Sequence, residues 1–213
     1  MKRGFAMAAA IGAAATVLPN AIVSSARAAS IVEEWARVKT PPTPELKPVT
    51  VDPKTTALLM LDYLPAPYCS PTPRCVANLP AIKRLLAEAR AKGATVVYSV
   101  AGNYTPADIL KDVAPAGNEP WVKSKADKFL NTDLEKILKD KGIQTVIVTG
   151  TAANAAVLYT STGAALRGLK VIVPVDSISA RDLYAEQLTV WQLAHGPGFG
   201  AQVTITKSDM IKF

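Results

Sequence analysis

The chain has 213 residues, of which 24 are basic and 17 are acidic, so its formal net charge is +7. Residues 1–28 hold three of the basic residues and no acidic ones, which leaves residues 29–213 with 21 basic and 17 acidic side chains. This excess is too mild and too scattered to indicate nucleic-acid binding. The length of residues 29–213 predicts one domain with a sizeable core.

The first 28 residues have the pattern of a secretory signal peptide. Lys2 and Arg3 precede an apolar run over residues 5–18, and an A-x-A cleavage site follows at residues 26–28. The apolar run is shorter than the about 20 residues that a membrane-spanning helix needs, which favours a signal peptide over an anchor. We expect cleavage after Ala28 and a periplasmic or secreted protein that is not stably inserted in a membrane. The sequence leaves the export route open.

A proline-rich segment, residues 29–54, follows the signal peptide. Its stretch VKTPPTPELKPVTVDPK, residues 38–54, contains five prolines, which oppose a regular helix. We therefore predict an extended arm that wraps the surface of one domain, residues 55–213.

Cys69 and Cys75 are the only cysteines of the chain and lie in the short stretch YCSPTPRC. Because an exported chain meets an oxidising compartment, we expect them to form a disulfide. A metal-binding pair and a reactive thiol remain the alternatives. Both lack a histidine partner nearby in the sequence, since the single histidine is His195.

From residue 55 onwards, patterns typical of strands alternate with patterns typical of helices. Apolar runs predict strands over residues 55–63, 94–100, 143–150, 169–176 and 201–206. Helical spacing predicts helices over residues 78–93, 132–142, 154–167 and 180–194, the last from Tyr184, Leu188 and Trp191. The stretch 101–131 is less regular. This alternation predicts an α/β fold with a mainly parallel central sheet between two helical layers, a Rossmann-like three-layer architecture.

In such sheets, ligands bind beyond the carboxyl ends of the strands. Asp62, Gly150 and Asp176 are expected there. Asp62 follows the apolar strand and is a candidate general acid or base, with an aspartate that caps a turn as an equal alternative. Asp176 is expected to orient a loop, and His195, at a helix end, is expected to be structural.

The stretch WVKSKADKF, residues 121–129, contains three lysines. Lys123 follows an apolar pair and is the one expected to be partly buried beside a carboxylate, where it would hold Asp62 ionised or stabilise a developing anion. Lys125 and Lys128 are expected to be solvated.

The turn over residues 150–156 reads GTAANAA and precedes a predicted helix. Its backbone N–H groups are candidates for an oxyanion or anion site that needs no side chain. The alternative is a close-packed start of a helix, which alanines also suit.

Three motifs in order resemble the isochorismatase-like hydrolases, a family that includes nicotinamidases and other cysteine amidohydrolases. ALLMLDY resembles the family's first strand, whose catalytic aspartate falls on Asp62, and VKSKADKFLNTDLEKIL resembles the segment K-x-x-x-S-A-F-x-x-T-x-L, whose catalytic lysine falls on Lys123. VTGTAANAAVLYTSTGAALRG is similar to G-V-A-T-N-x-C-V-x-x-T-A-x-x-A-x-x-x-G, which places the nucleophilic cysteine on Ala156. The following VIVPVDSIS fits the next strand and its aspartate, Asp176. The resemblance covers roughly residues 54–213 and implies the family's α/β/α fold. It also implies a substrate or oxyanion site at Ala152, Ala153, Asn154 and Ala155.

The departures from this pattern concern the chemistry. Alanine has no nucleophilic atom, so the acyl-enzyme route of the cysteine members is closed at Ala156. Ala153 replaces the threonine before the asparagine, and Tyr63-Leu64 stands where a glutamine often follows the aspartate. The D-x-H-x-x-H metal motif of nicotinamidases is absent from the sequence, so we predict no catalytic metal and no cofactor.

Isochorismatases resemble this chain more closely, because they keep the aspartate and lysine and carry a small residue at the nucleophile position. They cleave a vinyl ether by protonation from the aspartate. This implies an exported hydrolase that acts on a small molecule through Asp62 and Lys123. The alternatives are a catalytically inactive relative that binds a small ligand or a protein, and a displaced cysteine nucleophile. Homo-oligomers are common among proteins of this fold, so a homo-oligomer is expected.

Overall fold

The computed structural model describes residues 29–213, so the predicted signal peptide lies outside the described residues. Residues 29–40 belong to a separate unit from Pro41–Phe213. Within residues 29–40, a tight turn leads into one turn of 3-10 helix, Trp35–Arg37, and every side chain is exposed. This part of the predicted arm is therefore not fully extended. Within the described range, no helix is long and apolar enough to cross a bilayer.

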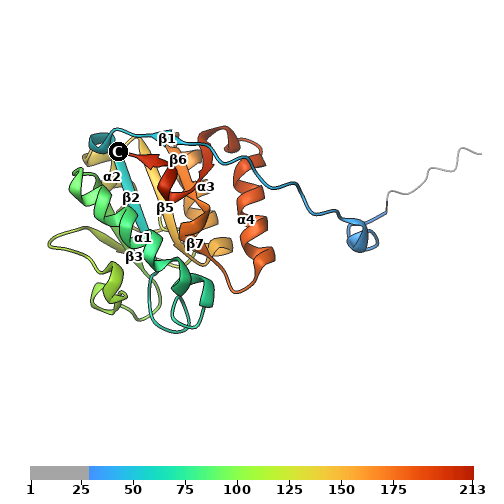
Figure 1. Ribbon diagram of the computed structural model, residues 1–213, viewed down its shortest axis with the longest axis horizontal. Helices are drawn as coiled ribbons and strands as arrows, with labels where there is room; N and C mark the ends of the chain where they lie inside the picture. The colour runs from blue at the N-terminus through green and yellow to red at the C-terminus, as the bar shows by residue number, and fades with distance from the viewer. Residues whose placement is uncertain (1–28) are drawn as a thin grey trace, which may run out of the picture. The chain divides into compact units, whose positions relative to one another are not determined.

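A parallel sheet of seven strands forms the middle layer of the second unit (Figure 1). The strand order is β4-β3-β2-β5-β6-β8, and β7 pairs with the end of β5. The central strands are buried on both faces, which explains why they read as continuous apolar runs rather than as alternating patterns. The strands are β2 (Thr56–Leu61), β3 (Thr95–Val100), β4 (Trp121–Lys123), β5 (Thr145–Thr151), β6 (Lys170–Pro174), β7 (Ile178–Ser179) and β8 (Val203–Thr206).

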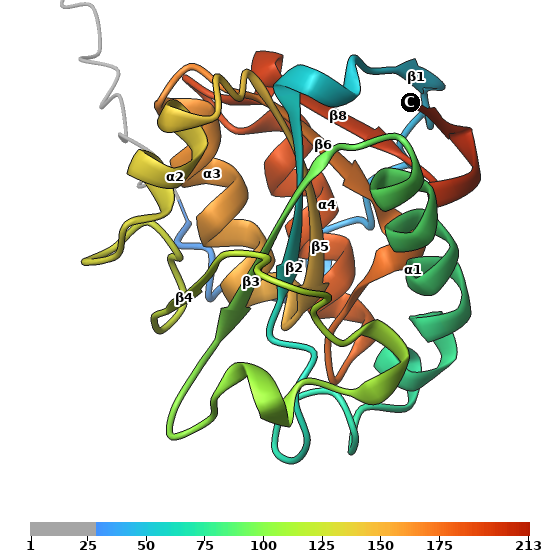
Figure 2. The ribbon, with the colours of Figure 1, turned by 90° about the vertical axis from the view of Figure 1, so that its left-hand side faces the viewer.

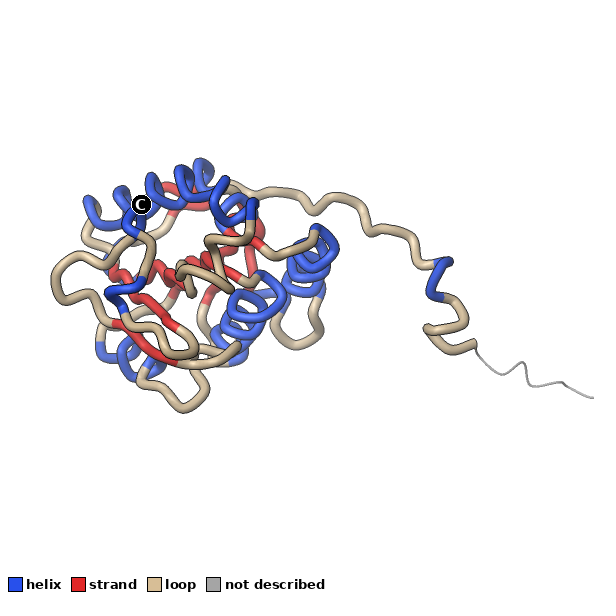
Figure 3. The backbone as a smooth tube through the Cα atoms, turned by 90° about the horizontal axis from the view of Figure 1, so that it is seen from below, coloured by secondary structure: helices blue, strands red, loops and turns tan. Residues whose placement is uncertain are grey.

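Helices cover both faces of this sheet, as the sequence predicts. Helix α1 (Pro73–Ala91) packs on one face, and α2 (Leu134–Asp140), α3 (Leu158–Leu166) and α4 (Leu183–His195) pack on the other. Figure 2 shows the strands between α1 and the pair α2 and α3, and Figure 3 shows helices around the strands on both sides. The α/β/α class is confirmed. Short 3-10 turns lie at Pro53–Thr55, Pro106–Asp108, Lys111–Val113, Val175–Ser177, Gly200–Gln202 and Ser208–Met210.

The helix patterns predict where α1 and α3 lie but not how they begin. Helix α1 begins five residues earlier than expected, with Pro73 at its first position, where a missing N–H costs nothing. Helix α3 begins later than expected, because a π-helical turn, Ala153–Val157, precedes it. Such single turns are frequent at functional sites.

The apolar pattern that predicts α4 marks the wrong face of that helix. Tyr184, Leu188 and Trp191 are exposed, and the buried side is formed by small and polar residues together with Leu193. Glu186 belongs to this buried side, where its carboxylate accepts hydrogen bonds from Arg74 of α1 and from the backbone N–H of residue 180, contacts that favour this orientation.

The proline-rich segment after Thr40 lies against the second unit. Strand β1 (Val49–Thr50) pairs in parallel with β9 (Ile211–Lys212) in a small separate sheet. The Lys47 N–H also donates to the carbonyl of Ile205 at 3.0 Å. Residues 41–54 are thus tied to the C-terminal end of the chain by backbone hydrogen bonds, which the sequence patterns did not predict.

Candidate active site

Asp62 follows β2 directly, at the carboxyl edge of the sheet. Its backbone has a φ of 55°, in the left-handed region that aspartate tolerates better than most residues. Beside it, β5 approaches β2 so closely that a Cβ on Gly150 would lie 2.3 Å from the Leu61 carbonyl oxygen. Gly150 is therefore required for the two strands to end side by side.

The Asp62 carboxylate is almost fully buried and both of its oxygens are bound. Oδ1 accepts a hydrogen bond from the Ser99 hydroxyl at 2.7 Å, and Oδ2 lies 2.7 Å from the Lys128 ammonium. Burial raises the pKa of Asp62 above its ordinary value of 3.8, although the charge and hydrogen bond of Lys128 and the hydrogen bond of Ser99 oppose this rise. Asp62 thus takes up a proton more readily than a solvated carboxyl, which suits a group that transfers protons.

Lys128 is the buried partner of Asp62, which corrects the assignment of Lys123. The Lys128 side chain is fully buried, and its ammonium donates to Asp62 and to the carbonyls of Ser124, at 3.2 Å, and Lys125, at 2.6 Å. All three ammonium protons are therefore satisfied. Lys123 instead ends the edge strand β4 with an exposed side chain.

The turn between β4 and α2 explains why Lys128 points inward. The Asp127 carboxylate accepts a hydrogen bond from the Phe129 N–H, and the Lys128 carbonyl accepts one from Thr132. The Lys128 N–H donates to Thr160 of α3. These contacts fold the segment back onto α3, and Phe129 at its end enters the core. The apolar Phe129 directly after Lys128 was the sequence signal that could have found it.

The turn after β5 faces Asp62 with small residues. The peptide bond between Thr151 and Ala152 is cis. Within residues 29–213, nothing accepts a hydrogen bond from the Ala152 N–H, so this donor is available to a ligand. Of the expected site residues, Ala152, Ala155 and Ala156 line the pocket beside Asp62, whereas Ala153 is buried in the core and Asn154 is exposed.

These elements enclose a pocket of about 370 Å³. Its walls are mostly methyl groups, and Asp62 and Lys125 are the charged side chains that line it. The lining residues are Asp62, Tyr68, Ala101, Gly102, Lys125, Ala126, Thr151, Ala152, Ala155 and Ala156. A pocket that is mainly apolar with few polar groups is typical of a small-molecule site.

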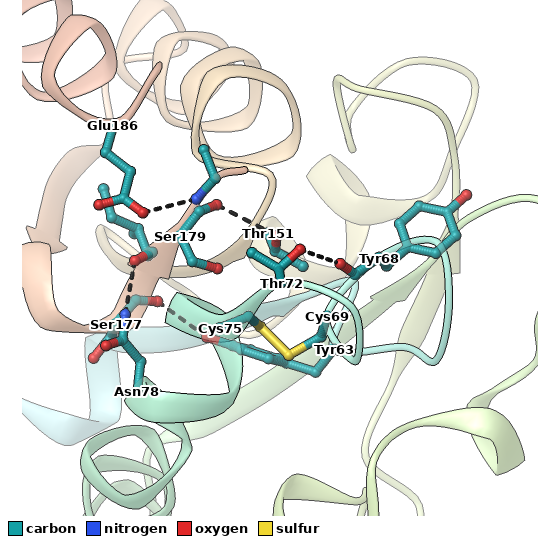
Figure 4. Close-up of a disulfide and its surroundings, with 12 residues drawn as sticks. Tyr63, Tyr68, Cys69, Thr72, Cys75, Asn78, Thr151, Ser177, Ser179 and Glu186 are labelled. Carbon is teal, nitrogen blue, oxygen red and sulfur yellow. Dashed lines mark hydrogen bonds between the residues drawn. A yellow bond between two sulfur atoms is a disulfide. The ribbon is translucent and has the colours of Figure 1, made fainter. Parts of the chain in front are cut away.

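The expected disulfide between Cys69 and Cys75 is confirmed and lies beside this pocket (Figure 4). Both cysteines are buried and no free cysteine occurs among the described residues, which rules out a displaced thiol nucleophile there. The bridge closes the loop that carries Tyr68, whose carbonyl also accepts a hydrogen bond from Thr72 at 2.8 Å. The disulfide therefore supports one wall of the pocket.

We expect that replacing both cysteines with alanine lowers the free energy of unfolding by about 2 kcal/mol, because the bridge closes a short loop in the unfolded chain. Urea denaturation of the wild type and the double variant measures this loss. Adding a thiol reductant should destabilise the wild type by a similar amount and leave the variant unchanged. A reductant effect of equal size on both proteins would contradict the assignment.

The remaining expected residues have structural contacts. The Asp176 carboxylate accepts hydrogen bonds from the N–H and the hydroxyl of Ser208 and so orients a loop. His195 contacts the Trp191 carbonyl at the end of α4. Over residues 29–213, no group of three or more histidine, cysteine, aspartate or glutamate side chains is placed to hold a metal ion.

The isochorismatase domain family matches residues 56–208 of the chain. The secreted isochorismatase effector Isc1 of Verticillium dahliae is 31% identical over 120 residues, which cover 50% of this chain and 62% of that protein. N-carbamoylsarcosine amidase of Arthrobacter is 30% identical over 131 residues, covering 48% of this chain and 50% of the amidase. The chain thus spans about half the length of these curated relatives.

Solved structures share the fold at lower identity. A cysteine hydrolase from Pseudomonas syringae superposes with a TM-score of 0.66 at 21% identity, covering 79% of this chain and 95% of that one. N-carbamoylsarcosine amidase from Thermoplasma acidophilum superposes with a TM-score of 0.61 at 20% identity, covering 73% and 97%.

Proposed function

Because the chain belongs to the isochorismatase family, we propose that it is an exported hydrolase of a small molecule that works without a cysteine nucleophile. Asp62 acts as the general acid–base and Lys128 as its electrostatic partner. The observation that carries this proposal is the buried Asp62–Lys128 pair at the edge of an alanine-lined pocket. A buried ion pair contributes little stability compared with a well-packed apolar pair, which favours a functional role for Asp62 and Lys128.

The chemistry that fits these groups is hydrolysis of a vinyl ether. Protonated Asp62 delivers its proton to the alkene carbon, and the double-bond electrons form the new C–H bond, which leaves an oxocarbenium ion. Water adds to this cation and returns a proton to the Asp62 carboxylate. The resulting hemiacetal collapses to a carbonyl compound and an alcohol. In this proposal the Ala152 N–H, for which residues 29–213 offer no acceptor, binds an oxygen of the substrate.

An amide-like substrate is the second possibility within the same site. Asp62 in its ionised form would then activate a water molecule as the nucleophile, because Ala156 offers none. A catalytically inactive protein that binds a small ligand is the alternative function, and the alanine at position 156 is the observation that favours it.

The experiment that separates these functions is a turnover assay of the purified full chain on vinyl ethers, including isochorismate, and on a panel of small amides and esters. Mass spectrometry follows products, and a thermal shift follows binding. Products that the wild type forms and Asp62→Ala does not form support the hydrolase. A ligand that raises the melting temperature and is never consumed, with no turnover on any class, supports the binding protein and overturns the hydrolase.

Placing a thiol at the family's nucleophile position tests the geometry of the pocket independently of the natural substrate. We expect Ala156→Cys to take up one acetyl group from p-nitrophenyl acetate on the peptide that contains position 156, because Asp62 lines the same pocket and can accept the thiol proton. Adding Asp62→Asn should slow this acylation by roughly 10²-fold. Ala156→Ser, which has a much weaker nucleophile, is the matched control. Acylation that does not depend on Asp62 would contradict the arrangement.

A further inference from the structure

One of the residues that line the pocket, Lys125, is a lysine without an acidic partner among the described residues. Asp62 is the carboxylate that lines it, and Lys128 compensates this charge from behind at 2.7 Å. Lys125 is a second cation in the lining, and its side chain is exposed. No carboxylate of the described residues lies within 4.0 Å of the Lys125 ammonium. Because Asp62 and Lys128 neutralise each other, the positive charge of Lys125 is the one that stays uncompensated among the residues at the pocket.

The backbone of Lys125 is fixed even though its side chain reaches solvent. Its carbonyl accepts the 2.6 Å hydrogen bond from Lys128, the same ammonium that holds Asp62. The Ser124 hydroxyl donates to the carbonyls of Asp127 and Leu130 and closes the turn. The backbone of Lys125 is thus anchored to the Asp62–Lys128 pair at the wall of the pocket.

Tyr68 contributes a neutral hydrogen-bond donor to the same pocket. Its ring packs edge to face on Tyr104, and its hydroxyl oxygen lies 3.3 Å from the position that a Cβ on Gly102 would occupy. The hydroxyl makes no hydrogen bond to another residue in the range 29–213, whereas most of the loop backbone around it is bonded. Burial and the nearby Asp62 charge raise the pKa of Tyr68, so the phenol stays protonated at neutral pH.

We propose that the ligands of this pocket carry a carboxylate, which pairs with the Lys125 ammonium and accepts a hydrogen bond from the Tyr68 hydroxyl. The neutral part of the ligand lies on the methyl groups of Ala155 and Ala156, next to Asp62. This inference deepens the proposed function, since it takes the same pocket as the ligand site and adds a small monoanion as the ligand class. Bringing an anion into a pocket that already holds Asp62 is favourable only because Lys128 compensates that carboxylate.

The test compares two probes of equal shape and different charge, benzoate and benzamide, bound to the full chain. Isothermal titration calorimetry at low ionic strength should show benzoate binding about three- to tenfold more tightly, as expected for one partly screened ion pair supported by a hydrogen bond. Lys125→Gln should remove this preference. Lys123→Gln is the matched control: it removes an exposed lysine two residues away that does not line the pocket, and it should keep the preference.

Several outcomes overturn the proposal. The proposal fails if the wild type binds benzoate and benzamide with equal affinity, or if it binds benzamide more tightly. The proposal also fails if Lys123→Gln and Lys125→Gln reduce the preference for benzoate equally, because the preference would then reflect the overall charge of the protein. Tyr68→Phe should weaken benzoate binding more than benzamide binding, because a carboxylate accepts a stronger hydrogen bond than an amide carbonyl does. A merely structural role of the ring would weaken the binding of both probes equally.

Asp62→Asn separates this inference from the proposed catalysis. Removing the negative charge of Asp62 should tighten benzoate binding while turnover is lost. If Asp62→Asn retains turnover and Lys125 still determines the benzoate preference, the proposed acid–base role fails and the anion site stands. If turnover depends on Asp62 and benzoate shows no preference, the anion site fails and the proposed function stands.

Discussion

Asp62→Asn is expected to lower the turnover number of any substrate that the protein consumes by roughly 10²- to 10⁴-fold, the range typical of a lost general acid or base. Asparagine keeps the shape of the side chain, and its single oxygen can accept a hydrogen bond from Lys128 while its amide group donates to the Ser99 hydroxyl. It cannot exchange a proton. The loss should therefore appear in kcat, with little change in KM, and steady-state kinetics of the wild type and the variant measure it.

The pH dependence of the wild type identifies which form of Asp62 works. Burial raises the pKa of Asp62 above 3.8, so an acid mechanism is fully active below this raised pKa and loses activity as the pH rises through it. A base mechanism behaves in the opposite way and loses activity as the pH falls through the same value. We expect the first profile for a vinyl ether and the second for an amide. An Asp62→Asn variant with unchanged kcat would contradict both the acid mechanism and the base mechanism.

The fold was predictable because buried parallel strands leave a strong mark in the sequence. The runs that became β2 and β5 are mostly apolar and almost fully buried, and a residue with positive φ lies at the carboxyl end of each, Asp62 and Gly150. The position of Asp62 follows from the strand alone. The disulfide follows from two cysteines in one short loop together with the predicted export of the chain.

The burial of Lys128 beside Asp62 and the exposed face of α4 could not be predicted from the sequence, for two different physical reasons. Lys128 is buried by a turn whose hydrogen bonds lie within residues 127–132 and join this segment to Thr160 of α3, and no periodic pattern records such a turn. The family register points to Lys123, which in this chain ends an exposed edge strand. In α4, the buried face carries Glu186, which pairs with the partly exposed Arg74, so the apolar pattern of Tyr184, Leu188 and Trp191 marks the exposed face instead. The hydrophobic pattern of α4 was thus misleading, whereas the turn that buries Lys128 has no periodic pattern at all.

Lys128→Met is expected to lower the free energy of unfolding by about 3–5 kcal/mol at neutral pH, because it leaves the Asp62 carboxylate buried without its partner. Lys123→Met removes an exposed lysine from β4 and should change stability by no more than about 0.5 kcal/mol. Urea denaturation of the two single variants at pH 7 makes the comparison. If Lys123→Met lowered the free energy of unfolding and Lys128→Met did not, Lys123 would be the partner of Asp62, as the resemblance to the family implies. The buried Asp62–Lys128 pair would then be refuted.

The loss in Lys128→Met should depend on pH with a definite sign. Without the ammonium, the folded-state pKa of Asp62 rises further above the 3.8 of the unfolded chain, so the folded protein binds more protons than the unfolded protein between these two values. The free energy of unfolding of the variant must then rise as the pH falls through this window. Adding Asp62→Asn to Lys128→Met should recover part of the stability at pH 7 and abolish the pH dependence, because the unpaired charge is gone. In Lys128→Met, the pH at which an acid mechanism loses activity would also rise, because the pKa of Asp62 is higher. The same ion pair would thus determine both the stability and the proton transfer.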